Sequence, residues 1–130
     1  MNEFQVGLAE STCSAVFPPG NTSILNIVDL GEIALERSSS AREAISLMGF
    51  LAEKYGYSDN GEHLFVGDPG EVWLFHILPD DTGASAIWAA QRIPAGHVSV
   101  VANAFVIREV NVSDASNFLA SGNILQVAKR

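Results

Sequence analysis

Apolar and polar positions alternate at the start of the chain. From Phe4 to Glu10 the order places Phe4, Val6 and Leu8 on one side of an extended segment, which predicts a β-strand. Residues 16–21, which contain two prolines and a glycine, then indicate a loop.

Two helices are predicted next. In residues 24–37 apolar side chains recur at helical spacing, and Arg37 lies in the last turn, where a positive charge complements the helix dipole. Ser40 and Glu43 have the form of a capping box, which opens a second helix that is predicted to end near Gly56. Its apolar stripe consists of Ala41, Ala44, Ile45, Met48, Leu51, Ala52 and Tyr55.

After residue 61 the pattern changes to short β-rich runs. The runs cover residues 63–66, 71–78, 85–91 and 97–108, and turn-forming residues separate them. This pattern predicts an antiparallel meander, and consecutive apolar residues such as Trp73-Leu74-Phe75 indicate a sheet covered on both faces. Residues 114–130 return to a weak helical pattern, with Asn123 as the cap of a last short helix.

These elements predict an α+β fold in which a helix pair packs on the antiparallel meander. The 130 residues match one small domain, but 48% hydrophobic residues is a high share for so short a chain. Such a share is expected of a piece whose faces pack on further chain. We therefore expect residues 1–130 to form a single incomplete domain, the internal part of a longer one.

Charge and hydropathy narrow the possible partners. Seven basic residues stand against fifteen acidic ones, giving a formal charge of −8 with no basic cluster to follow a phosphate backbone. Every apolar run is shorter than the roughly 18 residues that a membrane span requires. We therefore expect neither nucleic acid nor a membrane as a partner, while the oligomeric state and the compartment stay open.

No residue set in the chain completes a catalytic site by itself. The sequence lacks the HExxH, CxxC and GxSxG motifs and a phosphate-binding glycine loop. His63, His76 and His97 have no partners at metal-ligand spacing, so we interpret them as structural or surface histidines. Asp80 and Asp81 are interpreted as turn formers. No metal or other cofactor is expected.

Two polar positions allow more than one interpretation. Cys13 ends the first strand, where it is either a thiolate at a cleft or a small buried hydrophobic residue. Asn103 interrupts the apolar run of residues 100–105. A buried amide needs partners, so Asn103 either bonds neighbouring backbone or donates toward a substrate oxygen.

Short motifs also follow one another along the chain in a characteristic order. They are Met1–Glu3, Glu10–Cys13, Ser39–Ile45, Asp68–Trp73, Ile87–Pro94 and His97–Asn103. Together they resemble the cysteine dipeptidase family of the N-terminal-nucleophile (Ntn) hydrolase superfamily, to which secernins, penicillin V acylase and bile-salt hydrolase are related. The similarity covers essentially the whole chain.

The resemblance implies a partial αββα sandwich and a nucleophile that the chain does not contain. In the family the nucleophile is an N-terminal cysteine, whose free α-amine activates its own thiol. That cysteine is expected before Met1, and Cys13 does not match it. The chain by itself is therefore expected to be inactive.

The resemblance also assigns two site residues. Asn103 matches the asparagine that donates to the oxyanion in the relatives, and Thr12 falls near a second oxyanion contact, although the residue type differs. The implied function of the full-length protein is hydrolysis of short peptides, above all dipeptides, through a cysteine thioester. Two alternatives remain: hydrolysis of another linear amide, and a secernin-like non-catalytic or regulatory protein.

Overall fold

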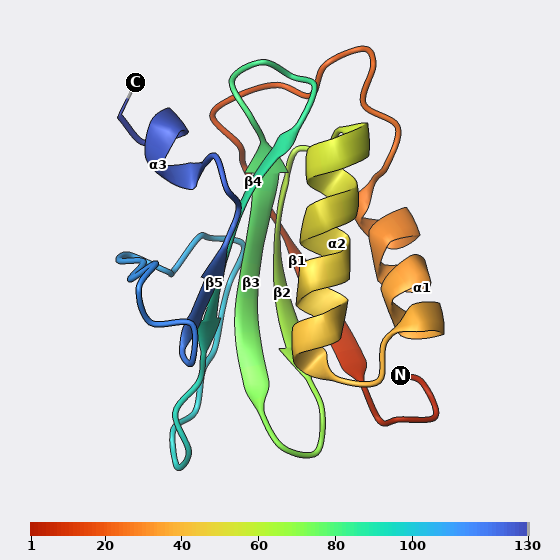
Figure 1. Ribbon diagram of the computed structural model, residues 1–130, viewed down its shortest axis with the longest axis vertical. Helices are drawn as coiled ribbons and strands as arrows, with labels where there is room; N and C mark the ends of the chain where they lie inside the picture. The colour runs from red at the N-terminus through yellow and green to blue at the C-terminus, as the bar shows by residue number, and fades with distance from the viewer. Residues whose placement is uncertain (130) are drawn as a thin grey trace.

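A computed structural model describes residues 1–129 and shows an antiparallel sheet with helices packed on it (Figure 1). The strand order within this part of the chain is β1-β2-β3-β4-β5, so strands that follow one another in sequence are neighbours in the sheet. The strands are β1 (Gly7–Cys13), β2 (Gly61–Gly67), β3 (Val72–Pro79), β4 (Ala86–Arg92) and β5 (Phe118–Ala120). The predicted α+β class and the meander through β2, β3 and β4 are confirmed.

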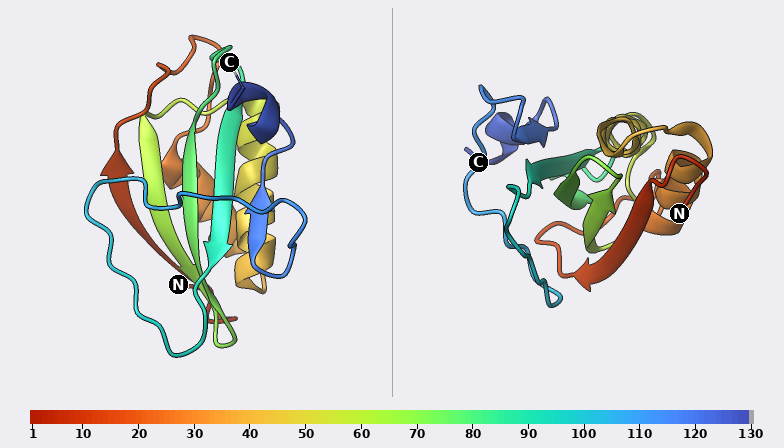
Figure 2. Two further views of the ribbon diagram at one scale, coloured as in Figure 1. Left: turned by 90° about the vertical axis from the view of Figure 1, so that its left-hand side faces the viewer. Right: turned by 90° about the horizontal axis from the view of Figure 1, so that it is seen from below.

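The helices α1 (Ile27–Arg37) and α2 (Ala41–Tyr55) lie side by side on one face of the sheet (Figure 2). Asn26 closes a complete capping box with Asp29, so α1 begins at residue 27 rather than at residue 24. At α2, Ser40 Oγ accepts from the Glu43 backbone N–H at 3.3 Å. The Glu43 carboxylate accepts from the backbone N–H of Ser39 instead of that of Ser40, so only half of the predicted capping box forms. Both predicted helices are confirmed. No helix within residues 1–129 is long and apolar enough to cross a membrane.

The main core lies between the helices and the sheet. Trp73, Phe75 and Ile77 alternate along β3, and all three side chains are fully buried. Gly49 of α2 packs directly on the Trp88 indole of β4, whose Nε1 donates to Glu53 at 2.7 Å. The close approach of helix and sheet therefore depends on the absence of a side chain at residue 49.

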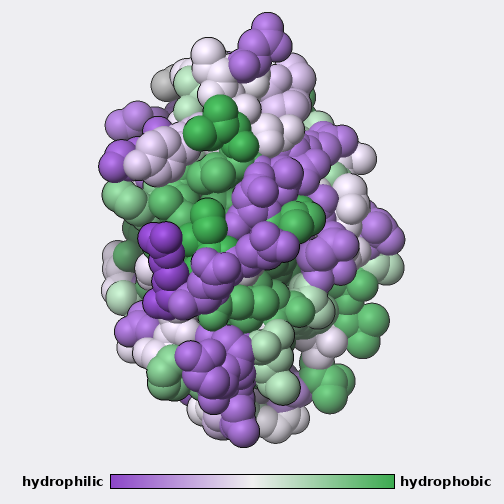
Figure 3. Space-filling view, turned by 90° about the vertical axis from the view of Figure 1, so that its right-hand side faces the viewer, coloured by the Kyte–Doolittle hydropathy of each residue, from purple (hydrophilic) through white to green (hydrophobic). Residues whose placement is uncertain are grey.

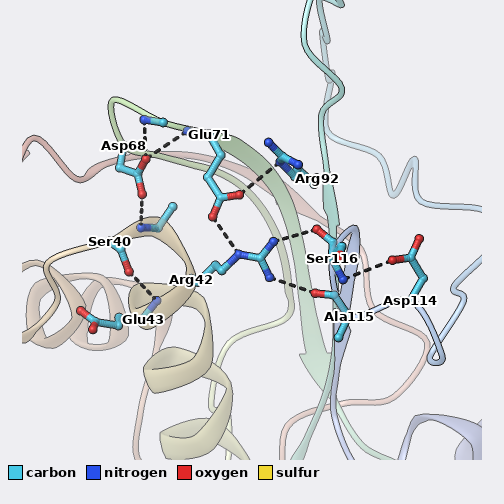
Figure 4. Close-up of polar contacts among 11 residues, drawn as sticks. Ser40, Arg42, Glu43, Asp68, Glu71, Arg92, Asp114, Ala115 and Ser116 are labelled. Atoms are coloured by element: carbon cyan, nitrogen blue, oxygen red, sulfur yellow. Dashed lines mark hydrogen bonds and ion pairs between the residues drawn. The ribbon is translucent and has the colours of Figure 1, made fainter.

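A clamp of charged groups ties α2 to the sheet (Figure 4). The Glu71 carboxylate pairs with Arg42 at 2.9 Å and with Arg92 at 3.1 Å. The Arg42 guanidinium lies 4.6 Å from the Trp73 ring centroid and donates to the main-chain carbonyls of residues 115 and 116. One arginine therefore joins α2, the start of β3 and the segment that leads into β5.

The opposite face of the sheet is crossed by an irregular segment, residues 93–117 (Figure 2). The strand predicted over residues 97–108 is wrong, because β5 occupies the free edge of β4 and leaves no partner for it. Phe105 still covers this face, with its ring centroid 5.1 Å from that of His76, whereas Val98 and Val100 are 94% and 87% exposed.

Two terminal details also differ from the sequence prediction. A turn at residues 2–6 delays the first strand, which runs from residue 7 to residue 13 instead of from residue 4 to residue 10. Residues 118–120 form the strand β5, so the helical pattern predicted over residues 114–130 is wrong for this segment. The short helix α3 (Ile124–Val127) is confirmed. Asn123 stands at its N-cap position, but the side chain donates to the Ala86 carbonyl at 3.1 Å instead of capping.

Candidate active site

The two site residues predicted from the sequence, Asn103 and Thr12, lie against each other. The Asn103 side-chain amide donates to the Thr12 carbonyl at 2.8 Å, and the Asn103 backbone N–H donates to Ser11 Oγ at 3.1 Å. These two bonds fasten the segment 93–117 to the end of β1. Residues 91 positions apart in the sequence are thereby brought into one place.

The surroundings of Asn103 differ from those predicted. Asn103 is exposed and lies outside any strand, so the premise of a buried strand position is wrong. Its φ is 40°, a left-handed conformation that asparagine tolerates better than most residues do. The side-chain amide bonds the backbone of Thr12, which agrees with the first interpretation of Asn103, that its amide bonds neighbouring backbone. An amide NH₂ group carries two protons, however, and the bond to Thr12 uses one of them.

Thr12 also borders a cavity of about 430 Å³ between β1, β2 and α1. Four carboxylate residues and a set of aliphatic side chains surround this space. The lining residues are Leu8, Glu10, Thr12, Ile27, Val28, Gly31, Glu32, Leu35, Asp59, Glu62 and Leu64. Thr12 therefore bonds Asn103 through its main chain and also lines the cavity.

Glu62 forms the buried part of this cavity. It stands opposite Thr12 in the β1–β2 ladder and is 2% exposed. Burial raises the pKa of Glu62 to about 7, and the neighbouring Glu10 carboxyl adds to the effect, while the Thr12 hydroxyl opposes it. Within residues 1–129, Glu62 Oε2 has no hydrogen-bond partner. No sequence motif singles out this group, although the alternation of β2 places Glu62 on the same face as Leu64.

Cys13 is a buried residue in the structure. It is 3% exposed, and its Sγ donates to the Ser11 carbonyl at 3.6 Å. Burial raises the pKa of the Cys13 thiol, and the charge of Glu62 adds to this shift. These features match the interpretation of Cys13 as a small hydrophobic residue and favour the thiol over the reactive thiolate.

The two buried histidines lie close to the segment that carries Asn103, because His63 stands opposite Ser11 in the β1–β2 ladder and His76 Nε2 accepts from the Val106 backbone N–H at 3.4 Å. The His63 and His76 rings are neighbours on the sheet face below Phe105, with 4.9 Å between their centroids and 60° between their planes, while His97 is exposed. No three His, Cys, Asp or Glu side chains among residues 1–129 are placed to hold a metal ion. Asp80 accepts from Thr82 and from the Ser85 amide, as expected of a turn former, and Asp81 lies in the same turn.

Comparison with known proteins gives a consistent result. A sequence model described as Peptidase family C69 matches residues 1–130. A protein of Latilactobacillus sakei named "Probable dipeptidase" is 34% identical over 119 residues, which are 91% of this chain and 20% of that protein. A Salmonella dublin protein with the same name is 30% identical over 98 residues, which are 75% of this chain and 21% of that protein. The chain spans about a fifth of the length of these relatives.

Proposed function

Because this chain belongs to Peptidase family C69, we propose that the protein of which it forms a part hydrolyses short peptides, and dipeptides above all. Both relatives described above carry the name "Probable dipeptidase", and both align with most of this chain. The chain is, in this proposal, the internal part of an Ntn-type catalytic domain that carries its nucleophile elsewhere. The substrate is a short peptide.

The proposed reaction is acyl transfer through a cysteine thioester. A cysteine sulfur outside residues 1–130 attacks the scissile carbonyl, the amine leaves with a proton, and water hydrolyses the thioester. The buried Cys13 does not suit the role of nucleophile, because the residue is 3% exposed and burial raises the pKa of its thiol. The chain without the outside cysteine is expected to have no turnover.

Asn103 is the residue of this chain that we assign to the reaction. The single observation that carries this assignment is the bond from Asn103 Nδ2 to the Thr12 carbonyl, which fixes the amide and leaves its second proton for an oxygen. A fixed donor stabilises the negative charge that develops on the carbonyl oxygen during attack. Thr12 acts in this proposal as a positioning residue, because its carbonyl orients the amide.

The test is Asn103→Ala in the intact protein, assayed on a panel of dipeptides. We expect kcat to fall about 100- to 1000-fold, the usual loss for one oxyanion donor, with a small change in KM. Asn111→Ala is the matched control, since Asn111 is exposed in the same segment and bonds its own turn. Ser11→Ala removes only the bond to the Asn103 backbone and is expected to cost less than about tenfold.

Two results would contradict the proposal. One is a folded Asn103→Ala protein that retains activity within about threefold of the parent, because a transition-state donor cannot be removed at so small a cost. The other is hydrolysis without a cysteine-linked acyl intermediate when the reaction is quenched early and examined by mass spectrometry.

A further inference from the structure

One row of side chains crosses the sheet beneath the segment that carries Asn103. The ladders place Ser11 of β1 opposite His63 of β2, and His63 opposite His76 of β3. Residues that stand opposite each other in a ladder share one face of the sheet, and we call these three residues the histidine row. The row lies on the face turned away from α1 and α2, whose side of the molecule shows apolar areas bordered by hydrophilic side chains (Figure 3). The sheet itself therefore separates the row from both helices.

The two ends of the histidine row hold the segment in place. Ser11 Oγ accepts from the backbone N–H of Asn103 at 3.1 Å, and His76 Nε2 accepts from the backbone N–H of Val106 at 3.4 Å. The Phe105 ring covers the row, with its centroid 5.1 Å from that of His76. Residues 93–117 contain no helix and no strand, so the position of Asn103 depends on contacts of this kind.

The bond from Val106 requires a neutral His76. An imidazole nitrogen accepts a hydrogen bond only while it carries no proton, and both nitrogens of an imidazolium are donors. Because the Val106 backbone N–H donates to Nε2, the single proton of His76 lies on Nδ1. A second proton would turn Nε2 into a donor that faces another donor, and the bond would be lost.

The surroundings of the row disfavour a charged histidine. His63 is 0% exposed and His76 is 5% exposed, and neither forms an ion pair within residues 1–129. Both ring nitrogens of His63 are without a hydrogen-bond partner in the same part of the chain. Burial lowers the pKa of His63, and burial together with the charge of His63 lowers the pKa of His76 to about 4. Both rings are therefore neutral at pH 7.

The other titratable groups near the row do not alter this balance. On β1, Cys13 is buried with a raised pKa, so its thiol stays neutral. On β4, the residue opposite His76 is Ala89. In the covering segment, Arg108 and Glu109 are exposed, as is His97, while Asp114 accepts from the backbone of its own turn.

We propose that His63 and His76 are positioning residues for Asn103, and that they hold its segment on the sheet only while both rings are neutral. In acid, a proton on His76 Nε2 ends the bond to Val106, and charge on the buried rings favours a state in which the segment has left the sheet and water reaches them. The effect on turnover rests on the proposed function, in which Asn103 is the oxyanion donor, whereas the release of the segment does not.

Hydrogen exchange of the intact protein tests the release without any substrate. The quantity is the protection factor of residues 102–107, which is the exchange rate of an unstructured peptide divided by the measured rate at the same pH. A histidine with a pKa of about 4 on the sheet and about 6.5 when released makes opening about 100-fold more favourable at pH 4 than at pH 7. We expect the protection factor to fall at least about tenfold. Residues 44–52 of α2 should remain protected at both pH values, which shows that the fold is intact.

Variants identify the groups that cause the release. His76→Gln keeps an acceptor for the Val106 N–H but does not titrate, so it should lessen the fall in protection at least about threefold. His63→Gln and His76→Gln together should remove the fall. His97→Gln is the matched control, because His97 is an exposed histidine of the same segment, and it should leave the fall unchanged within about twofold.

Dipeptide hydrolysis provides the second readout. At pH 7, His76→Leu removes the acceptor and should lower kcat about tenfold with KM within about twofold, because a displaced donor weakens the transition state more than substrate binding. His76→Gln should retain kcat within about threefold. The ratio of parent kcat to that of the double glutamine variant should fall at least about twofold between pH 7 and pH 4, since half of His76 is protonated at its pKa of about 4. Groups elsewhere in the enzyme affect both proteins alike and leave this ratio unchanged.

The possible outcomes distinguish the two proposals. Equal protection of residues 102–107 at pH 7 and pH 4, or an equal fall in the double glutamine variant, overturns the role of the histidines even if dipeptides are hydrolysed. Release that depends on the histidines, in a protein without dipeptidase activity, leaves the attachment standing and overturns the proposed function. Release in an active protein whose kcat ratio does not change with pH shows that the row does not position Asn103 for the reaction.

Discussion

Two glycines within helices give a prediction in which the same substitution has opposite effects. Gly49 lies in the middle of α2 and Gly31 in α1, so alanine at either position gains about 1 kcal/mol of helix propensity. A Cβ at residue 49 would come within 2.5 Å of Trp88 Nε1, whereas a Cβ at residue 31 would lie 3.5 Å from Leu8 Cδ1. Only the first substitution forces a neighbour to move.

The magnitude follows from what holds the Trp88 indole in place. Its Nε1 donates to Glu53 at 2.7 Å, and its ring lies 5.7 Å from that of Phe75. Overpacking of this kind costs about 1–3 kcal/mol, and loss of a hydrogen bond to a charged group adds about 1.5–3 kcal/mol. After the propensity gain, Gly49→Ala is expected to destabilise the fold by about 2 kcal/mol. Gly31→Ala is expected to stabilise it by up to about 1 kcal/mol.

The assay is urea unfolding followed by tryptophan fluorescence and far-ultraviolet circular dichroism. In the intact protein, a difference of about 3 kcal/mol between the two variants corresponds to a midpoint shift of roughly 1–3 M urea, at the slope of about 1–3 kcal/mol/M that small domains show. Comparing the two alanine variants removes the propensity term, which both share. If Gly49→Ala raised the urea midpoint as much as Gly31→Ala does, the close packing of α2 on the Trp88 ring would be contradicted.

Two further predictions concern the charged clamp and the buried histidines. Arg42→Lys is expected to lower the unfolding free energy by about 1–2 kcal/mol, nearly as much as Arg42→Ala. Arg42 reaches Glu71 and the two carbonyls with three separate nitrogens, whereas the three N–H donors of a lysine share one nitrogen and cannot span these acceptors. Equal stability of the lysine and parent proteins in urea would contradict this. Burial, and then the charge of His63, lowers the pKa of His76 to about 4. The unfolded chain therefore takes up this proton first, so the stability contributed by neutral His76 is present above pH 6.5 and is lost as the pH falls toward 4. His76→Gln should reduce the slope of unfolding free energy against pH in that range, and an unchanged slope would show that another group causes the loss.

Much of the fold is readable from the sequence because its determinants are local. The α2 helix combines an apolar stripe with a capping serine at residue 40, and both features act within a few residues. The turns that separate β2, β3 and β4 likewise depend on adjacent glycine, proline and aspartate residues. The edge of the sheet is different, because residues 97–108 have strand composition while residues 118–120 occupy the position beside β4.

For the candidate site, too, some features follow from the sequence and others only from the tertiary structure. The sequence by itself determined the helix pair, the central meander and, through a resemblance, the choice of Asn103 and Thr12. Only the tertiary structure decided that the Asn103 amide bonds Thr12, that Cys13 is buried, and that Glu62 lies in a cavity with three other carboxylates. Periodicity and capping act over one or two turns of chain, whereas burial and hydrogen-bond partners depend on which distant segments the fold brings together.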